Sequence, residues 1–200
     1  MYKMKKDKYH QILEAAICVF ARNGFFQSTI SQIAKEAGVA DGTIYLYFKN
    51  KDDILVQFFS YKTKKVFTSF QEEVDKVGDP KDKLKNLIRR HLKEFQHDRN
   101  MAIVFQAEIK QIHKIEALKQ SVSNISKMYK NIVGEIIEKG QEEGLMRKDL
   151  YLGLVKHLIL GAVAEVINTW IFSSSDYDLV SMADPMVDLL LNGIASEHAV

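Results

Sequence analysis

The chain has 200 residues, of which 46% are hydrophobic and 27% charged, and its net charge is +2. This composition is typical of a soluble globular protein, and the length is sufficient for a stable hydrophobic core. The one cysteine, Cys18, excludes an intramolecular disulfide, and the longest apolar run, residues 158–167, is about half of the ~20 residues that span a bilayer. We therefore expect a cytoplasmic protein with no membrane-spanning segment and no membrane partner.

Helical periodicity runs through nearly the whole chain, and no segment alternates strictly enough to predict a strand. The first helix is expected over residues 7–22 and ends at Asn23-Gly24. Ser28 or Thr29 can cap a second, short helix that ends at Gly38. A third short helix is expected over residues 41–47. These three helices form a predicted head, residues 1–50.

The rest of the chain, residues 51–200, predicts a body of six more helices. Their expected ranges are 51–77, 81–96, 100–111, 115–143, 149–172 and 179–191. The predicted fold class is therefore all-α, with a three-helix head on a six-helix body. The whole chain has only two prolines, Pro80 and Pro185, which agrees with a helical fold because proline breaks helices.

The head is more basic than the chain as a whole. Through Lys51 it has eight basic residues against four acidic ones, and four of the lysines lie within residues 3–8. A basic arm before a small domain is typical of a protein that binds a polyanion. Lysines that only improve solubility are the alternative.

Residues 29–48 fit a helix-turn-helix. Small and apolar side chains occupy the positions at which two short helices must pack, namely Ile33, Ala34, Ala37, Val39 and Ile44. Gly38 lies at the turn, where a positive φ is easiest for glycine. The outer face of the second of these helices, with Thr43 and Tyr45, is then free to enter a major groove.

These residues resemble a known family. The run from Ile33-Ala34 through Ala37-Gly38-Val39, Gly42-Thr43-Ile44-Tyr45 and Tyr47-Phe48 to Lys51 is similar to the TetR family of bacterial transcriptional regulators. The resemblance implies that the bases of double-stranded operator DNA are faced by Ser31, Asp41, Gly42, Thr43 and Tyr45. It implies that the phosphates are held by Thr29, Tyr47 and Lys51. Ser31 departs from members that have a longer basic side chain there.

The last two predicted helices each present an apolar face. The resemblance implies that they pair with their copies in a homodimer, through Leu154, Leu158, Ala162, Met182, Met186, Leu189 and Leu190. A dimer would read two half-sites of a palindrome. The alternative is that these side chains form the core of one protomer.

The middle helices are rich in aromatic residues and methionine, which often line apolar cavities. The family resemblance implies a small-molecule effector that shifts the protein away from its DNA-binding conformation. The predicted effector-binding residues are Phe67, His91, Phe95, Met101, Val104, Phe105, Glu108, Ile109, Met128, Ile167 and Trp170. Ordinary core packing is the alternative for each.

Three stretches, residues 37–51, 102–108 and 169–170, are similar to regulators of fatty-acid degradation. That similarity implies release from DNA by long-chain acyl-CoA. Candidates for the phosphate end of such a ligand are Arg89, Arg90, Lys93, Arg99 and Lys110. The competing ligand is a lipophilic cation, with Glu108 or Glu165 beside aromatic rings as its counter-charge.

The sequence offers little support for an enzyme. No two of the six histidines have the spacing of a helical zinc site, and there is no glycine-rich phosphate loop or nucleophile elbow. We therefore predict no catalytic residue, no metal site and no cofactor. A nonspecific DNA binder is disfavoured because the net charge is small. The predicted function is a dimeric repressor that a small hydrophobic effector releases from its operator.

Overall fold

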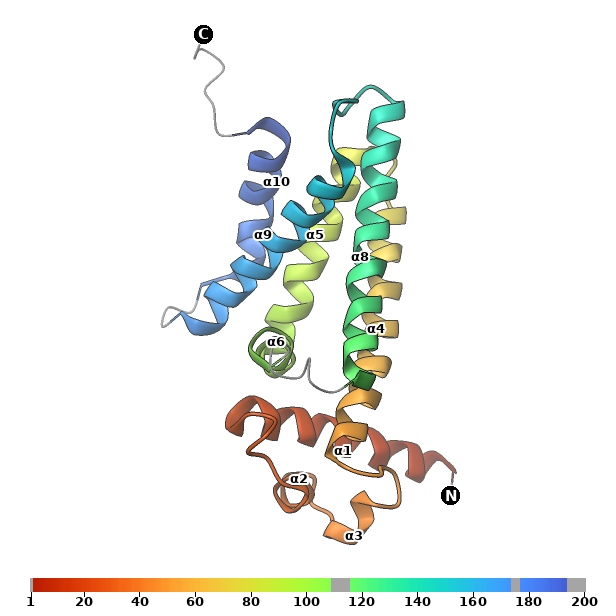
Figure 1. Cartoon of the computed structure of the whole chain (residues 1–200), viewed down its shortest axis with the longest axis vertical. Helices are drawn as coiled ribbons and strands as arrows, with labels where there is room; N and C mark the ends of the chain where they lie inside the picture. Colours follow the sequence, from red (N-terminus) through yellow and green to blue (C-terminus); the bar gives the residue numbers. More distant parts are fainter. Residues whose placement is uncertain (1, 109–115, 174–176, 194–200) are drawn as a thin grey trace. The chain divides into compact units, whose positions relative to one another are not determined.

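A computed structural model describes residues 2–108, 116–173 and 177–193, apart from the side chains of residues 2–7, 107, 108, 117 and 121. Across these residues the chain is helical and has no strand, which confirms the predicted all-α fold (Figure 1). The chain divides into two compact units. The first comprises residues 1–65 and 98–125, and the second comprises residues 66–97 and 126–200. The division at residue 50 stays a prediction, because both units include part of α4 (Lys51–Asp75) and of α8 (Glu116–Glu142).

The first unit is built on α1 (Tyr2–Asn23), which contacts α2 (Ile30–Glu36), α6 (Arg99–Ile103) and the π-helical turn η1 (Val104–Glu108). The short α3 (Asp41–Ile44) contacts α2. α1 buries an apolar stripe, and Gly24, with φ of 79°, follows the end of the helix. Lys62 of α4 forms ion pairs with two other parts of this unit. Its ammonium lies 3.2 Å from the carboxylate of Glu14, on α1, and 2.9 Å from that of Asp98, the residue that caps α6.

The second unit is organised around α5 (Pro80–His97), whose buried stripe includes Leu84, Ile88 and Leu92. The start of α5 is fixed locally, since Pro80 occupies the first helical position and Asp79 accepts hydrogen bonds from the first turn. α5 contacts α9 (Leu152–Phe172), the 3₁₀ turn η2 (Leu179–Met182) and α10 (Ala183–Asn192).

Several predicted helices differ from the structure in their bounds. α1 begins at Tyr2 rather than at residue 7, and α9 begins at Leu152 rather than at residue 149. α3 ends at Ile44 rather than at Tyr47, and the helix predicted over 100–111 is α6 followed by η1. The last helix begins at Ala183, after η2, rather than at Leu179. Pro185 explains this last difference, because proline lacks an N–H and is accepted in the first turn of a helix but not in its interior.

One helix among the described residues, α9, is long and apolar enough to cross a membrane, with a mean hydropathy of 1.4. A core helix of a soluble protein meets the same criteria, so this is weak evidence for a membrane segment. Several apolar side chains of α9 are exposed within one chain, including Leu154, Leu158 and Phe172.

Candidate functional site

The helix-turn-helix predicted from the sequence forms between α2 and α3. Thr29 caps α2, because its hydroxyl accepts the N–H of Gln32 at 3.2 Å and the Gln32 side chain accepts the N–H of Thr29 at 2.9 Å. Ser28 is buried instead, and its hydroxyl donates to the carbonyl of Gly24. Gly38, with φ of 62°, makes the turn into α3. The capping role of Thr29 leaves its hydroxyl proton available to a phosphate oxygen.

The outer face of this motif is open. Tyr45 is 59% exposed and Asp41 and Gly42 are exposed, whereas Ile44 and Phe48 are buried beneath them. Thr43 and Tyr47 are half-buried. The burial pattern therefore separates the packing residues Ile44 and Phe48 from exposed residues that are able to contact a partner.

Leu46, which is 79% exposed beside Tyr45, was not among the predicted contact residues. An apolar side chain this exposed could contact thymine methyl groups in a major groove. The sequence does offer a signal for Leu46: it lies between two tyrosines in a segment too short to bury all three side chains.

Two predicted base-facing residues contact each other. The hydroxyl of Ser31, on α2, donates a hydrogen bond to the carboxylate of Asp41, the first residue of α3. This contact orients Asp41 from the neighbouring helix. The short Ser31 side chain, which departs from the family pattern, thus has a partner inside the motif.

Lys51 occupies an unexpected place for a predicted phosphate contact. Its ammonium donates to the carbonyl oxygens of Phe25, Phe26 and Ser28 at 2.7, 3.1 and 2.9 Å. It also lies 4.6 Å from the centre of the Phe25 ring. Burial lowers the pKa of Lys51, with Asp52 opposing the shift. In this arrangement the three ammonium protons hold the segment that leads into α2, and the phosphate role stays a prediction.

The second unit has an aromatic cluster that contains several predicted effector-binding residues. His91 of α5 packs against the rings of Phe70, Phe95 and Tyr129, with ring centres 5.3, 5.2 and 4.9 Å away. Phe67 extends the cluster, 5.4 Å from Phe70. Burial lowers the pKa of His91 to about 3, so its imidazole is neutral near pH 7. Tyr129 comes from α8 and was not among the predicted effector-binding residues.

The other predicted effector-binding residues are distributed over both units. Ile167 and Trp170 are buried in the second unit, where the Trp170 indole donates to the carbonyl of Tyr177, and Met128 is 41% exposed. In the first unit Met101 and Val104 are buried, and Phe105 is half-buried, 4.5 Å from the Phe59 ring. The side chain of Glu108 and all of Ile109 lie outside the described residues.

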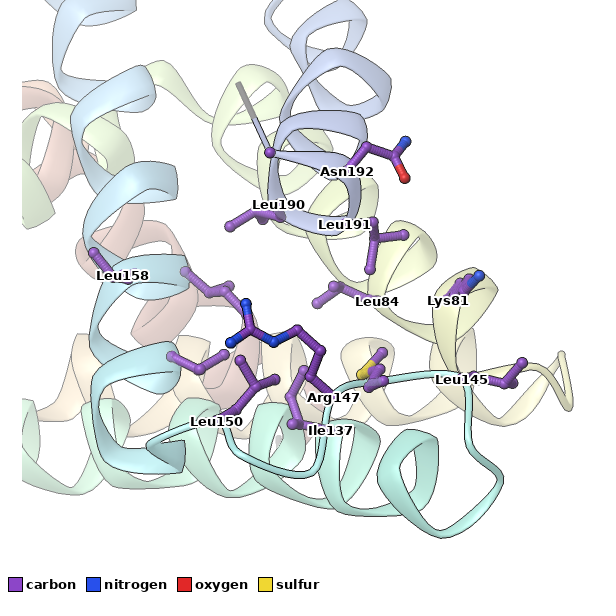
Figure 2. Close-up of a pocket in the computed structure, with 14 residues that line it drawn as sticks. Lys81, Leu84, Ile137, Leu145, Arg147, Leu150, Leu158, Leu190, Leu191 and Asn192 are labelled. Carbon is purple, nitrogen blue, oxygen red and sulfur yellow. The ribbon is translucent and has the colours of Figure 1, made fainter. Parts of the chain in front are cut away.

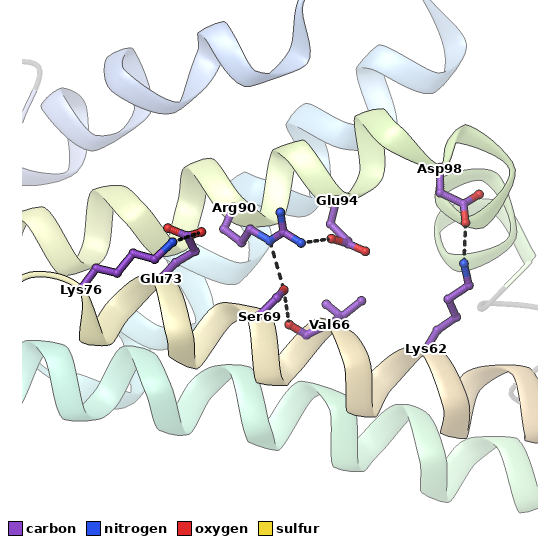
Figure 3. Close-up of polar contacts among 8 residues, drawn as sticks. All are labelled: Lys62, Val66, Ser69, Glu73, Lys76, Arg90, Glu94 and Asp98. Atoms are coloured by element: carbon purple, nitrogen blue, oxygen red, sulfur yellow. Dashed lines mark hydrogen bonds and ion pairs between the residues drawn. The ribbon is translucent and has the colours of Figure 1, made fainter.

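Two of the five basic residues proposed for the phosphate end of an acyl-CoA, Arg89 and Arg90, are paired with carboxylates. Arg89 binds both carboxylate oxygens of Asp184, at 2.6 and 2.9 Å. Arg90 donates to Ser69 at 3.1 Å and to Glu94 at 2.7 Å (Figure 3). Lys93 is exposed, Arg99 is exposed at the start of α6, and Lys110 lies outside the described residues. Glu165, a predicted counter-charge for a cation, is exposed on α9.

A separate cavity of about 650 Å³ opens within the second unit. Its lining is mainly apolar, with Lys81 and Arg147 as the cationic residues, and Figure 2 shows the Arg147 guanidinium among the leucines. Arg147 also binds Asp149, at 3.0 and 2.7 Å. Of the predicted effector-binding residues whose side chains the structure describes, none lines this cavity, whereas Leu158 and Leu190, predicted for the dimer interface, do. The sequence did not reveal it because its residues come from four helices and a loop.

The predicted dimer residues fall into two groups. Leu154, Leu158 and Leu189 are 52–57% exposed, and Ala162, Met182 and Leu190 are half-buried. Met186 is only 8% exposed within a single chain. Met186 therefore packs mainly in the core of its own protomer, as the alternative interpretation had it, because α10 turns that side of the helix toward the rest of the second unit.

Comparisons with known proteins agree with the geometry of the head. Residues 12–58 match the model of bacterial regulatory proteins of the tetR family, and residues 59–193 match that of the C-terminal region of YsiA-like proteins. The chain is 40% identical over 192 residues to the fatty acid metabolism regulator protein of Bacillus subtilis (strain 168), covering 96% of this chain and 98% of that protein. The chain belongs to the TetR family.

Two solved structures of TetR-type regulators resemble it along nearly the whole chain. The regulator FadR from Bacillus subtilis, solved in complex with stearoyl-CoA, is 40% identical with a TM-score of 0.86, covering 94% of this chain and 100% of that one. The fatty acid degradation regulator FadR from Bacillus halodurans is 37% identical with a TM-score of 0.87, covering 94% and 96%.

Family membership settles the class of activity. The protein is a DNA-binding transcriptional regulator and not an enzyme, since the matched families and these relatives are regulators. The resemblance found in residues 33–51 is therefore confirmed for the family and the fold. The individual DNA, effector and dimer contacts remain predictions.

Proposed function

We propose that this TetR-family protein represses transcription as a dimer on a palindromic operator and that long-chain acyl-CoA releases it from DNA. The observation that carries the proposal is the 40% identity and TM-score of 0.86 with a regulator solved with stearoyl-CoA. Similarity of this level extends over both the head and the body, so it includes the part of the chain that would hold an effector. A cytoplasmic location follows from this function.

The DNA part of the proposal rests on the exposed face of the helix-turn-helix. Thr43 and Tyr45 offer hydroxyl groups, and Tyr45 and Leu46 offer apolar surface to a major groove. Thr29 and Tyr47 flank this face and can hold the backbone phosphates. A head this small reads few bases, so two copies related by a twofold axis are needed for a selective site.

The dimer part rests on exposed leucines of the last two helices. Leu154 and Leu158 on α9 and Leu189 on α10 are each more than half exposed. Large apolar side chains gathered on two neighbouring elements are characteristic of a protein interface. Pairing of these helices with a second copy would remove the leucines from water and would also explain the high hydropathy of α9.

The test is release from DNA. A fluorescent palindromic duplex, selected by the protein from a random-sequence library, is bound by the full chain and followed by anisotropy. Stearoyl-CoA, free CoA, stearate and tetraphenylphosphonium are then titrated separately. We expect release by stearoyl-CoA alone. Release by the cation alone would show that the effector is a lipophilic cation rather than an acyl-CoA. If none of the four compounds changes DNA binding, acyl-CoA is removed from the proposal.

A further inference from the structure

His91 and Tyr129 form a polar pair inside the aromatic cluster of the second unit. The two rings are 4.9 Å apart, and both side chains are almost fully buried, with 8% and 2% of their surface exposed. Among the residues that the structure describes, neither the His91 Nδ1 nor the Tyr129 hydroxyl has a hydrogen-bond partner. The pair thus joins α5 and α8 by two polar groups that do not satisfy each other.

This arrangement is unfavourable for a core without a ligand. A buried polar atom without a hydrogen bond destabilises the fold, and the great majority of such atoms in proteins have a partner. The neighbouring positions are apolar, because the rings of Phe70 and Phe95 pack against His91 and that of Phe70 also packs against Tyr129. Phenylalanine at either position would fill similar space without the unpaired atom. Two such atoms in one apolar cluster indicate a polar group of a ligand that hydrogen-bonds to both.

We propose that His91 and Tyr129 together bind the carbonyl oxygen of the acyl group of the effector. This inference rests on the proposed function and names the contact that recognises the ligand. A carbonyl oxygen accepts two hydrogen bonds and joins an alkyl chain, which suits two polar groups among phenylalanine rings. The Tyr129 hydroxyl donates one hydrogen bond, and His91 donates the other in the tautomer with its proton on Nδ1.

The same cluster favours a neutral acyl group over a free fatty acid. Burial keeps the His91 imidazole neutral, and it raises the pKa of Tyr129, which therefore keeps its proton. The pair then provides hydrogen-bond donors but no positive charge for a carboxylate, whose desolvation among apolar rings is costly. A thioester carbonyl carries no such charge, so the pair selects the activated acyl group.

The experiment compares two ligands that differ only at the carbonyl. Stearoyl-CoA and its thioether analogue, S-octadecyl-CoA, which has a methylene in place of the carbonyl, are titrated into the full chain by calorimetry. The variants are Tyr129→Phe and His91→Phe, and the control is Tyr151→Phe, a tyrosine of the same unit that is 77% exposed. Circular dichroism and a thermal melt establish that each variant is folded.

We expect the wild-type protein and Tyr151→Phe to bind the thioester about tenfold more tightly than the thioether, as expected for buried hydrogen bonds. Tyr129→Phe should lose this preference while keeping its affinity for the thioether. His91→Phe should lose most of the preference for the thioester. A preference that persists in both variants, or is absent from the wild-type protein, would overturn the inference and leave acyl-CoA as the effector. Failure of the wild-type protein to bind either ligand would instead overturn the proposed effector, and the inference with it.

Discussion

The ammonium of Lys51 donates a 2.7 Å hydrogen bond to the carbonyl oxygen of Phe25 and lies 4.6 Å from the centre of its ring. Two more bonds, to the carbonyls of Phe26 and Ser28, use its remaining protons. Lys51 begins α4, and Ser28 immediately precedes the cap of α2. This lysine therefore fixes the loop between α1 and α2 against the first turn of α4.

Lys51→Met should destabilise the head rather than remove a phosphate contact. Charge-assisted hydrogen bonds contribute about 1.5–3 kcal/mol, so the melting temperature should fall by several degrees. Binding to all duplexes should weaken, with the slope of log K against log salt concentration unchanged. Lys81→Met, at an exposed lysine of the second unit, serves as the control. A slope reduced by about one at unchanged melting temperature would restore the phosphate role predicted from the sequence.

Thr43→Ala should relax sequence preference at one or two base pairs. Loss of a hydrogen bond to a base edge costs about 1–3 kcal/mol of discrimination, whereas contacts to phosphate carry no sequence information. Binding of single-substitution operator duplexes measures the effect, and Tyr47→Phe, at a predicted phosphate contact, provides the comparison. Equal losses on operator and scrambled duplexes for Thr43→Ala would contradict its role in reading bases.

Leu154→Glu should weaken the dimer. A charge in the middle of an apolar interface must be desolvated without a partner, which we expect to raise the dimer dissociation constant at least about tenfold. Sedimentation velocity measures this constant directly. The matched control is Leu46→Glu in the head, where the leucine is also exposed: this variant should remain dimeric and lose affinity for DNA. Unchanged dimerisation of Leu154→Glu would place the interface elsewhere.

His91 should make the protein less stable in mild acid. Its pKa in the folded protein, about 3, lies below the ordinary value of 6.5, so protons bind preferentially to the unfolded chain. The full stability is therefore present above pH 6.5, and the contribution of this group is lost as the pH falls from 6.5 toward 3.

Between pH 6.5 and 5 this loss should be about 2 kcal/mol in the free energy of unfolding. Urea denaturation at both pH values, compared between the wild-type protein and His91→Phe, isolates the effect. The variant should show a smaller decrease than the wild-type protein. Parallel decreases in the two proteins would mean that the His91 imidazole is accessible to protons in the folded state.

The helix-turn-helix was predictable because its signals are local. Apolar spacing in residues 29–48, a capping threonine and a glycine at the turn all act within one short segment, and the burial of Ile33, Ala34 and Ile44 follows from them. The sequence likewise determined the all-α fold and the buried stripe of α5. The length of α3 was less predictable, since a single turn at the end of a motif has few hydrogen bonds of its own.

Tertiary structure decided what each apolar face packs against. Helical periodicity shows which side of α10 is apolar but not whether its own protomer or a second copy covers that side, so the sequence left the burial of Met186 open. The sequence likewise does not show that Tyr129 contacts His91, because that contact depends on the packing of α8 beside α5. Nor does it show the partners of Lys51, which lie in a loop distant in sequence. Contacts between elements far apart in sequence depend on how helices pack, and residue spacing within one helix does not specify that packing.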